Sequence, residues 1–183
     1  GANVIGIARN ESKLEQLKEE MAYKEKFSYV IRDLSIDIDE LPNLVSKIVK
    51  EYGKLTGLVY AAGKLELLPI KALDSNSIDS LYNVNFKSLL MTTKGFTDKR
   101  NSLENSSIVY ISSISSILGV KGAVTYSTSK GAINSLVKTL AVEVSNRKIR
   151  VNSVLPGFIN TTLALKNKDL YSPEYLNELD TMY

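Results

Sequence analysis

The feature that most constrains the fold is a regular alternation of short apolar runs with segments of helical periodicity. Short runs rich in β-branched and aromatic residues suit strands that are buried within a sheet. A strand, a helix and another strand, repeated along a chain, favour a parallel sheet covered by helices on both faces. The predicted strands are Val4–Ala8, Phe27–Ile31, Gly57–Ala61, Ile108–Ile111 and Arg150–Leu155.

The predicted helices repeat apolar residues every three or four positions. Ser12-Lys13-Leu14-Glu15 has the form of a capping box and would begin the first helix. We find no internal repeat or linker, so residues 1–183 are interpreted as a single α/β domain. The predicted helices are Ser12–Ala22, Leu41–Tyr52, Ser75–Gly95, Tyr126–Ser145 and a short one after Pro173.

Composition excludes several function classes. Hydrophobic residues make up 44% and charged residues 23% of the chain, and the net charge is +3, which argues against a nucleic-acid partner. No apolar run approaches the roughly 18 residues of a membrane helix, so no membrane partner is expected. The chain has no cysteine and no histidine, so a thiolate nucleophile and a Ser-His-Asp triad are impossible and the usual zinc ligands are missing. We therefore expect no metal site, a cytoplasmic location, and proton chemistry that uses tyrosine, lysine or carboxylates.

Such chemistry is concentrated between Ile108 and Lys130. A buried strand ends in serines that include Ser113, and a helix begins near Tyr126. Tyr126 and Lys130 stand four positions apart and therefore share one helix face. The carboxyl ends of parallel strands are where open α/β sheets hold ligands, so these side chains can converge on one site.

This pattern resembles the active site of the short-chain dehydrogenase/reductase family. Ser113 stands thirteen positions before Tyr126, as in the classical members that include 3-oxoacyl-[acyl-carrier-protein] reductases. The chain also has a second Tyr-x-x-x-Lys, from Tyr60 to Lys64, which we interpret as coincidental because Gly63 makes a helical face unfavourable there. Further matches in family order are Asn85, Ala62-Gly63 and Pro156-Gly157.

The resemblance implies a Rossmann-like fold and an NAD(P)-dependent enzyme that interconverts a ketone and a secondary alcohol by hydride transfer. Tyr126 would be the general acid and base and would also contact the cofactor. Lys130 would lower the pKa of Tyr126 and bind the nicotinamide ribose. Ser113 would hydrogen-bond the substrate oxygen, and Asn85 would hold a water behind Lys130. Taken singly, each residue also has a purely structural interpretation, such as a helix start or a strand end.

The resemblance also implies cofactor-binding positions. Arg9 stands where a cation can pair with a 2′-phosphate, and the preceding position, which is acidic in NAD-preferring relatives, is Ala8; NADP is therefore favoured over NAD. Asp33 would lie beside the adenine. Ala61, Ala62 and Gly63 replace the family's Asn-Ala-Gly, and Ala61 cannot supply the asparagine's side-chain hydrogen bonds. Pro156, Gly157, the Ile159 backbone and Thr161 would meet the nicotinamide amide.

One family element is missing from the printed chain. No glycine-rich turn joins a first strand to a first helix, so we expect the sequence to be partial, with a further strand also missing after Tyr183. Without the first strand, Val4–Ala8 and Phe27–Ile31 would have no neighbour that joins them to the other strands.

Two alternative functions remain open. A non-catalytic cofactor-binding or regulatory protein could use the same fold, and an extended-type sugar-nucleotide epimerase or dehydratase shares Tyr-x-x-x-Lys. The helices Ser75–Gly95 and Tyr126–Ser145 carry more apolar residues than one sheet face needs. The resemblance implies that these helices form a homodimer or homotetramer interface.

Overall fold

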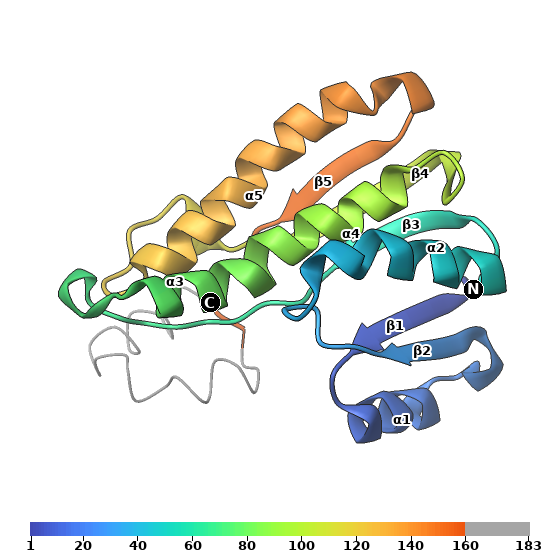
Figure 1. Cartoon of the computed structure of the whole chain (residues 1–183), viewed down its shortest axis with the longest axis horizontal. Helices are drawn as coiled ribbons and strands as arrows, with labels where there is room; N and C mark the ends of the chain where they lie inside the picture. Colours follow the sequence, from blue (N-terminus) through green and yellow to red (C-terminus); the bar gives the residue numbers. More distant parts are fainter. Residues whose placement is uncertain (160–183) are drawn as a thin grey trace.

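The computed structural model describes residues 1–159 and has a Rossmann-like α/β fold (Figure 1). All paired strands run parallel, as the alternation of elements predicts. Thr161 and the helix expected after Pro173 lie outside the described residues. The strands are β1 (Val4–Ala8), β2 (Phe27–Ile31), β3 (Leu55–Tyr60), β4 (Ser102–Ile111) and β5 (Arg150–Val154).

The described part of the chain has five α-helices; α2 has the predicted bounds, and the others differ from the prediction at their ends. The segment predicted as one helix from Ser75 to Gly95 is instead two α-helices joined by a π-helical turn, η4 (Asn83–Lys87). The α-helices are α1 (Glu11–Glu20), α2 (Leu41–Tyr52), α3 (Ser75–Tyr82), α4 (Ser88–Thr97) and α5 (Val124–Glu143). Short 3₁₀ turns are η1 (Lys24–Lys26), η2 (Ile38–Glu40), η3 (Ile70–Ala72), η5 (Ile114–Ser116) and η6 (Ser145–Arg147).

The strands form two separate sheets, with orders β1-β2 and β3-β4-β5. Within residues 1–159, no ladder of hydrogen bonds joins β1 to β3, which confirms that the first two strands stand apart (Figure 1). Each of these strands therefore has one edge without a partner strand in the described part of the chain.

The main core lies between the three-stranded sheet and the helices α4 and α5. Alternate residues of β4 point into it, because side chains on a strand alternate between faces. The opposite face of this sheet is open in the described chain, where Val59 and Val154 are 68% and 50% exposed. The buried cluster comprises Tyr60, Leu89, Phe96, Ile108, Tyr110, Ile133, Leu140, Val144, Ile149 and Val151.

The two-stranded sheet has a much smaller core. Leu14 of α1 and Phe27 of β2 are the buried hydrophobic residues of this part, at 5% and 3% exposure. Asn10, rather than Ser12, caps α1, because its extended backbone lets its side-chain oxygen accept a hydrogen bond from the Lys13 amide at 2.9 Å. The predicted capping box at Ser12 is therefore wrong.

Candidate active site

The π-helical turn η4 directs Asn85 into the protein, where it is fully buried. Its side-chain oxygen accepts a hydrogen bond from the Lys64 amide at 2.7 Å. Its amide nitrogen donates to the Lys64 carbonyl at 3.0 Å and to Ser129 Oγ on α5 at 3.1 Å. Asn85 therefore ties the segment after β3 to α5, and π-helical turns often occur at functional sites.

Ser113 lies at the carboxyl end of β4 and caps η5. Its Oγ accepts a hydrogen bond from the Ser115 amide at 3.2 Å. The turn is fixed from two sides, because the Ile114 amide donates to the Pro156 carbonyl at 3.0 Å and Ser116 Oγ donates to the Ser113 carbonyl at 2.5 Å. The backbone on either side of Ser113 is thus held in place.

Asn134 of α5 supports the same turn, and the sequence analysis missed it. Its side-chain nitrogen donates to Ser116 Oγ at 2.6 Å. Because Ser116 in turn donates to the Ser113 carbonyl, Asn134 connects α5 to the serine turn. The available signal was its spacing, since Asn134 follows Lys130 by one helical turn on the same face.

Tyr126 and Lys130 lie on the first turns of α5. The Lys130 side chain is only 5% exposed, and its Nζ donates to the Ile111 carbonyl at 2.8 Å. The same Nζ lies 5.8 Å from the centre of the Tyr126 ring. A β-carbon built on Gly63 would lie 3.5 Å from Lys130 Nζ and 3.7 Å from Asn85 Oδ1, so these two groups face the same glycine.

Burial controls the titration of both groups. It raises the pKa of Tyr126 above its usual value, although a hydrogen bond with the Ser113 side chain acts in the opposite direction. Burial also lowers the pKa of Lys130 to about 8. The net shift of the Tyr126 pKa is therefore upward, since desolvation of the phenol outweighs the effects that favour the phenolate. Tyr126 is protonated at neutral pH, which is the form that a general acid requires.

The second Tyr-x-x-x-Lys copy forms no helical face, as predicted. The Tyr60 hydroxyl is buried in the core, where it donates to the Val84 carbonyl at 2.9 Å and lies 2.5 Å from Ser88 Oγ. Burial raises the pKa of Tyr60 to about 12. Lys64 follows the end of β3 outside any helix, so it shares no helix face with Tyr60.

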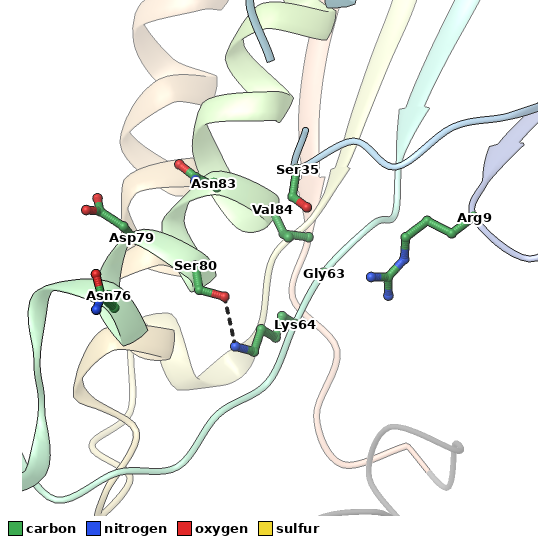
Figure 2. Close-up of a pocket in the computed structure, with 9 residues that line it drawn as sticks. All are labelled: Arg9, Ser35, Gly63, Lys64, Asn76, Asp79, Ser80, Asn83 and Val84. Carbon is green, nitrogen blue, oxygen red and sulfur yellow. Dashed lines mark hydrogen bonds between the residues drawn. The ribbon is translucent and has the colours of Figure 1, made fainter. Parts of the chain in front are cut away.

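A cleft of about 650 Å³ opens beside this site (Figure 2). Arg9, just after β1, enters it with a side chain that is 74% exposed and lies 3.5 Å from Asp33. A hydrogen bond from the Ser35 side chain is the main cause of the lowered pKa of Asp33, and Arg9 adds to it. The residues that line the cleft are Arg9, Ser35, Gly63, Lys64, Asn76, Asp79, Ser80, Asn83 and Val84.

The remaining predicted cofactor positions lie at strand ends. Ala61 and Ala62 follow β3, and Ala62 packs against the main core. Pro156 and Gly157 follow β5, and Ile159 is 54% exposed. The described candidate residues therefore gather where β3, β4 and β5 end, except Arg9 and Asp33, which follow β1 and β2.

Comparison with known proteins places these observations in a family. Residues 1–170 match the model of the short chain dehydrogenases. The chain is 31% identical over 175 residues to an uncharacterized oxidoreductase of Saccharomyces cerevisiae, covering 95% of this chain and 66% of that protein. It is 35% identical over 130 residues to a 3-oxoacyl-[acyl-carrier-protein] reductase of Thermotoga maritima, covering 71% of this chain and 53% of that protein.

A solved structure described as "ElxO with NADP Bound" superposes with a TM-score of 0.79 at 26% identity, covering 92% of this chain and 68% of that one. The chain thus spans two thirds or less of the length of the two curated relatives. The matched region nevertheless includes β1 to β5 and all the described site residues. The chain belongs to the short-chain dehydrogenase family of oxidoreductases.

Proposed function

We propose that this protein is an oxidoreductase that interconverts a ketone and a secondary alcohol with NADP(H). The observation that carries the proposal is the convergence of Ser113, Tyr126 and Lys130 at the carboxyl ends of β4 and β5, with Asn85 behind them. The hydrogen bonds described above hold the Ser113 turn, Lys130 Nζ and Asn85 in place. Nothing else in the described chain combines a proton donor, an oxygen-orienting hydroxyl and a buried cation.

In this proposal Tyr126 donates its phenolic proton to the substrate oxygen during reduction and takes it back during oxidation. Ser113 hydrogen-bonds the same oxygen and orients the carbonyl. Lys130 stabilises the phenolate that forms, because an ammonium group close to the ring favours the charged form. Asn85 would hold a water behind Lys130, on the path of the proton.

The cofactor, when bound, supplies the hydride. The residues present are compatible with such a group, because Gly63 has no side chain beside Lys130 and also lines the cleft of about 650 Å³. Ala61, Ala62 and Gly63 would approach the cofactor through their backbone, and Asp33 would lie beside the adenine. Pro156, Gly157 and the Ile159 backbone would face the nicotinamide; Thr161, assigned to the same role, lies outside the described residues.

Arg9 supports a preference for NADP over NAD. Its exposed guanidinium stands at the mouth of the cleft and is held only loosely by Asp33, at 3.5 Å. A guanidinium can bind a 2′-phosphate through two hydrogen bonds. NADH has no 2′-phosphate and cannot form this contact. The relative solved with NADP bound is consistent with this choice.

We also propose a homodimer or homotetramer in the cytoplasm. The helices predicted as the interface correspond to α3, η4 and α4 on one side and α5 on the other, and Val142 near the end of α5 is 76% exposed. Within residues 1–159, no helix has both the length and the hydropathy to cross a membrane. Light scattering over a dilution series tests the association, and a monomer at every micromolar concentration would exclude this interface.

The reaction can be tested with the purified whole protein and a panel of ketones. We expect ketone-dependent oxidation of NADPH, followed optically, and the reverse reaction with the product alcohol and NADP⁺. Chromatography should identify one alcohol for each NADPH consumed. If the protein binds NADPH but turns over neither ketones nor secondary alcohols, the oxidoreductase proposal is wrong.

A further inference from the structure

We infer that Lys64 is a second phosphate-binding cation of the cofactor cleft, opposite Arg9. This inference rests on the proposed function, since it assigns a ligand group to the same cleft. Lys64 belongs to the coincidental Tyr-x-x-x-Lys copy, so the catalytic assignment leaves its side chain unexplained.

The backbone of Lys64 is fixed more firmly than that of an ordinary loop residue. Asn85 accepts from its amide at 2.7 Å and donates to its carbonyl at 3.0 Å, so both backbone polar groups are bound by one buried side chain. The preceding residue, Gly63, faces Lys130 Nζ. Gly63 and Lys64 both line the cleft, so Lys64 lies one residue away from the contact with the proposed reaction centre.

The side chain of Lys64 extends toward α3, as Figure 2 shows. Its Nζ donates to Ser80 Oγ at 3.1 Å and lies 3.3 Å from a carboxylate oxygen of Glu66. The Lys64 side chain is 38% exposed, so its ammonium group is accessible from the cleft. A lysine held by one hydroxyl and one partly exposed carboxylate can exchange the carboxylate for a phosphate oxygen at low cost.

The charges around the cleft favour an anion at this place. Arg9 and Lys64 line the cleft from separate elements, and the acidic residue that also lines it, Asp79, is paired with Lys87 at 3.4 Å. Two cations that line the same partly desolvated cleft attract phosphate more strongly than either does alone. A nicotinamide dinucleotide offers two kinds of phosphate, the diphosphate bridge and the 2′-phosphate of NADP.

Four variants of the whole protein, with Arg9→Ala for comparison, test the inference through equilibrium dissociation constants for NADPH and NADH, measured by fluorescence titration. Lys64→Gln removes the cation, Lys64→Arg keeps it, and Glu66→Gln removes the carboxylate that competes with the phosphate. Lys71→Gln is the matched control, since it removes a cation from an exposed position on η3.

We expect Lys64→Gln to weaken NADPH binding by about three- to tenfold, the range for a half-exposed charged hydrogen bond. Lys64→Arg and Lys71→Gln should stay within about twofold of wild type, and Glu66→Gln should bind about twofold more tightly because the ammonium is released. Equal weakening of NADH by Lys64→Gln would assign the contact to the diphosphate. Weakening of NADPH alone would assign it to the 2′-phosphate.

Three results would overturn the inference. The first is a Lys64→Gln variant that matches Lys71→Gln for both nucleotides, while Arg9→Ala still weakens NADPH binding; the proposed function would then stand without Lys64. The second is a Glu66→Gln variant as weak as Lys64→Gln, which would show that the Lys64–Glu66 pair is only structural. The third is a wild-type protein that binds neither nucleotide, which would overturn the proposed function as well.

Discussion

The three-stranded and two-stranded parts of the molecule carry different parts of the site. The sheet β3-β4-β5 packs with α4 and α5 around a large buried core. This part of the molecule carries Ser113, Tyr126 and Lys130. The sheet β1-β2 holds Arg9 and Asp33, and its buried hydrophobic residues are Leu14 and Phe27. The groups proposed for proton transfer are therefore on the rigid part, and those proposed for choosing the cofactor are on the lightly packed part.

This difference in packing matches the different requirements of proton transfer and of cofactor recognition. Proton transfer needs donors and acceptors held to within a fraction of an ångström, which close packing provides. Recognition of an exposed phosphate needs mainly charge at the right place, which a long and mobile arginine can supply. A buried cation is costly to the fold, whereas an exposed one is almost neutral.

The largest predicted effect concerns the buried cation. The pKa of Lys130 is about 8 in the folded protein, against 10.5 as its ordinary value. Between these two values the unfolded chain binds more protons, so the contribution of Lys130 to stability rises with pH. The difference in the free energy of unfolding between wild type and Lys130→Met should therefore change by about 3 kcal/mol from pH 7 to pH 10.5, in favour of wild type at the higher pH.

Urea unfolding of both proteins at several pH values measures this difference. Tyrosines ionise in the unfolded state near the upper end of this pH range. Their contribution to the pH dependence of stability is common to both proteins and cancels in the difference. A matched control is Arg9→Ala, whose side chain is 74% exposed and whose stability should follow wild type at each pH. A constant gap between Lys130→Met and wild type would show that Lys130 is not desolvated.

The next effect compares two glycines, one in each part. A β-carbon at Gly95 of α4 would lie 2.8 Å from Pro42 Cα and 2.9 Å from Val45 Cβ, where α2 leaves no room. A β-carbon at Gly6 of β1 would instead meet the tip of the Phe27 ring at 2.8 Å, which can move aside. We expect Gly95→Ala to lower the free energy of unfolding by about 2 kcal/mol and Gly6→Ala by less than about 1 kcal/mol.

Denaturation midpoints at constant pH decide this comparison. The Gly95→Ala cost includes a helix-propensity gain of up to about 1 kcal/mol, so the measured value is a lower bound on the packing cost. Equal losses at both glycines would contradict the view that the two parts differ in packing.

The smallest effect concerns the cofactor. Arg9→Ala should reduce the preference for NADPH over NADH by about fivefold, which corresponds to about 1 kcal/mol for a charged contact made by an exposed arginine. The KM values for both nucleotides measure the change, and kcat should stay the same because Arg9 is remote from Tyr126. A wild-type protein that prefers NADH would show that Arg9 has been misassigned.

The main strands and helices could be predicted because their hydrophobic periods are clear. The bounds of β1, β2 and α2 are those that the pattern predicts. In each of these segments a single hydrophobic period fits the residues, so the type of element and its ends are well defined. The first half of β4, from Ser102 to Ser107, is in contrast mostly polar, and its Ser102 and Ser107 pair with β3 on either side of a register shift. The prediction therefore began that strand too late, at Ile108.

Within the site, residue identity was predictable and environment was not. The spacing of Ser113, Tyr126 and Lys130 can be counted directly in the sequence. The π-helical turn at Asn85 is not, because one extra residue in a helical turn leaves the local pattern almost unchanged. The raised pKa of Tyr126 and the support of Ser116 by Asn134 both arise from packing between segments distant in the chain.

The central claim is that Tyr126, and not the tyrosine of the other Tyr-x-x-x-Lys copy, transfers the proton. Tyr126→Phe and Tyr60→Phe each remove one hydroxyl, so kcat for ketone reduction can be compared between two matched variants of the whole protein. We predict that Tyr126→Phe lowers kcat at least about a hundredfold, whereas Tyr60→Phe keeps kcat and loses about 1 kcal/mol of stability. Near-normal turnover by Tyr126→Phe would contradict the assignment.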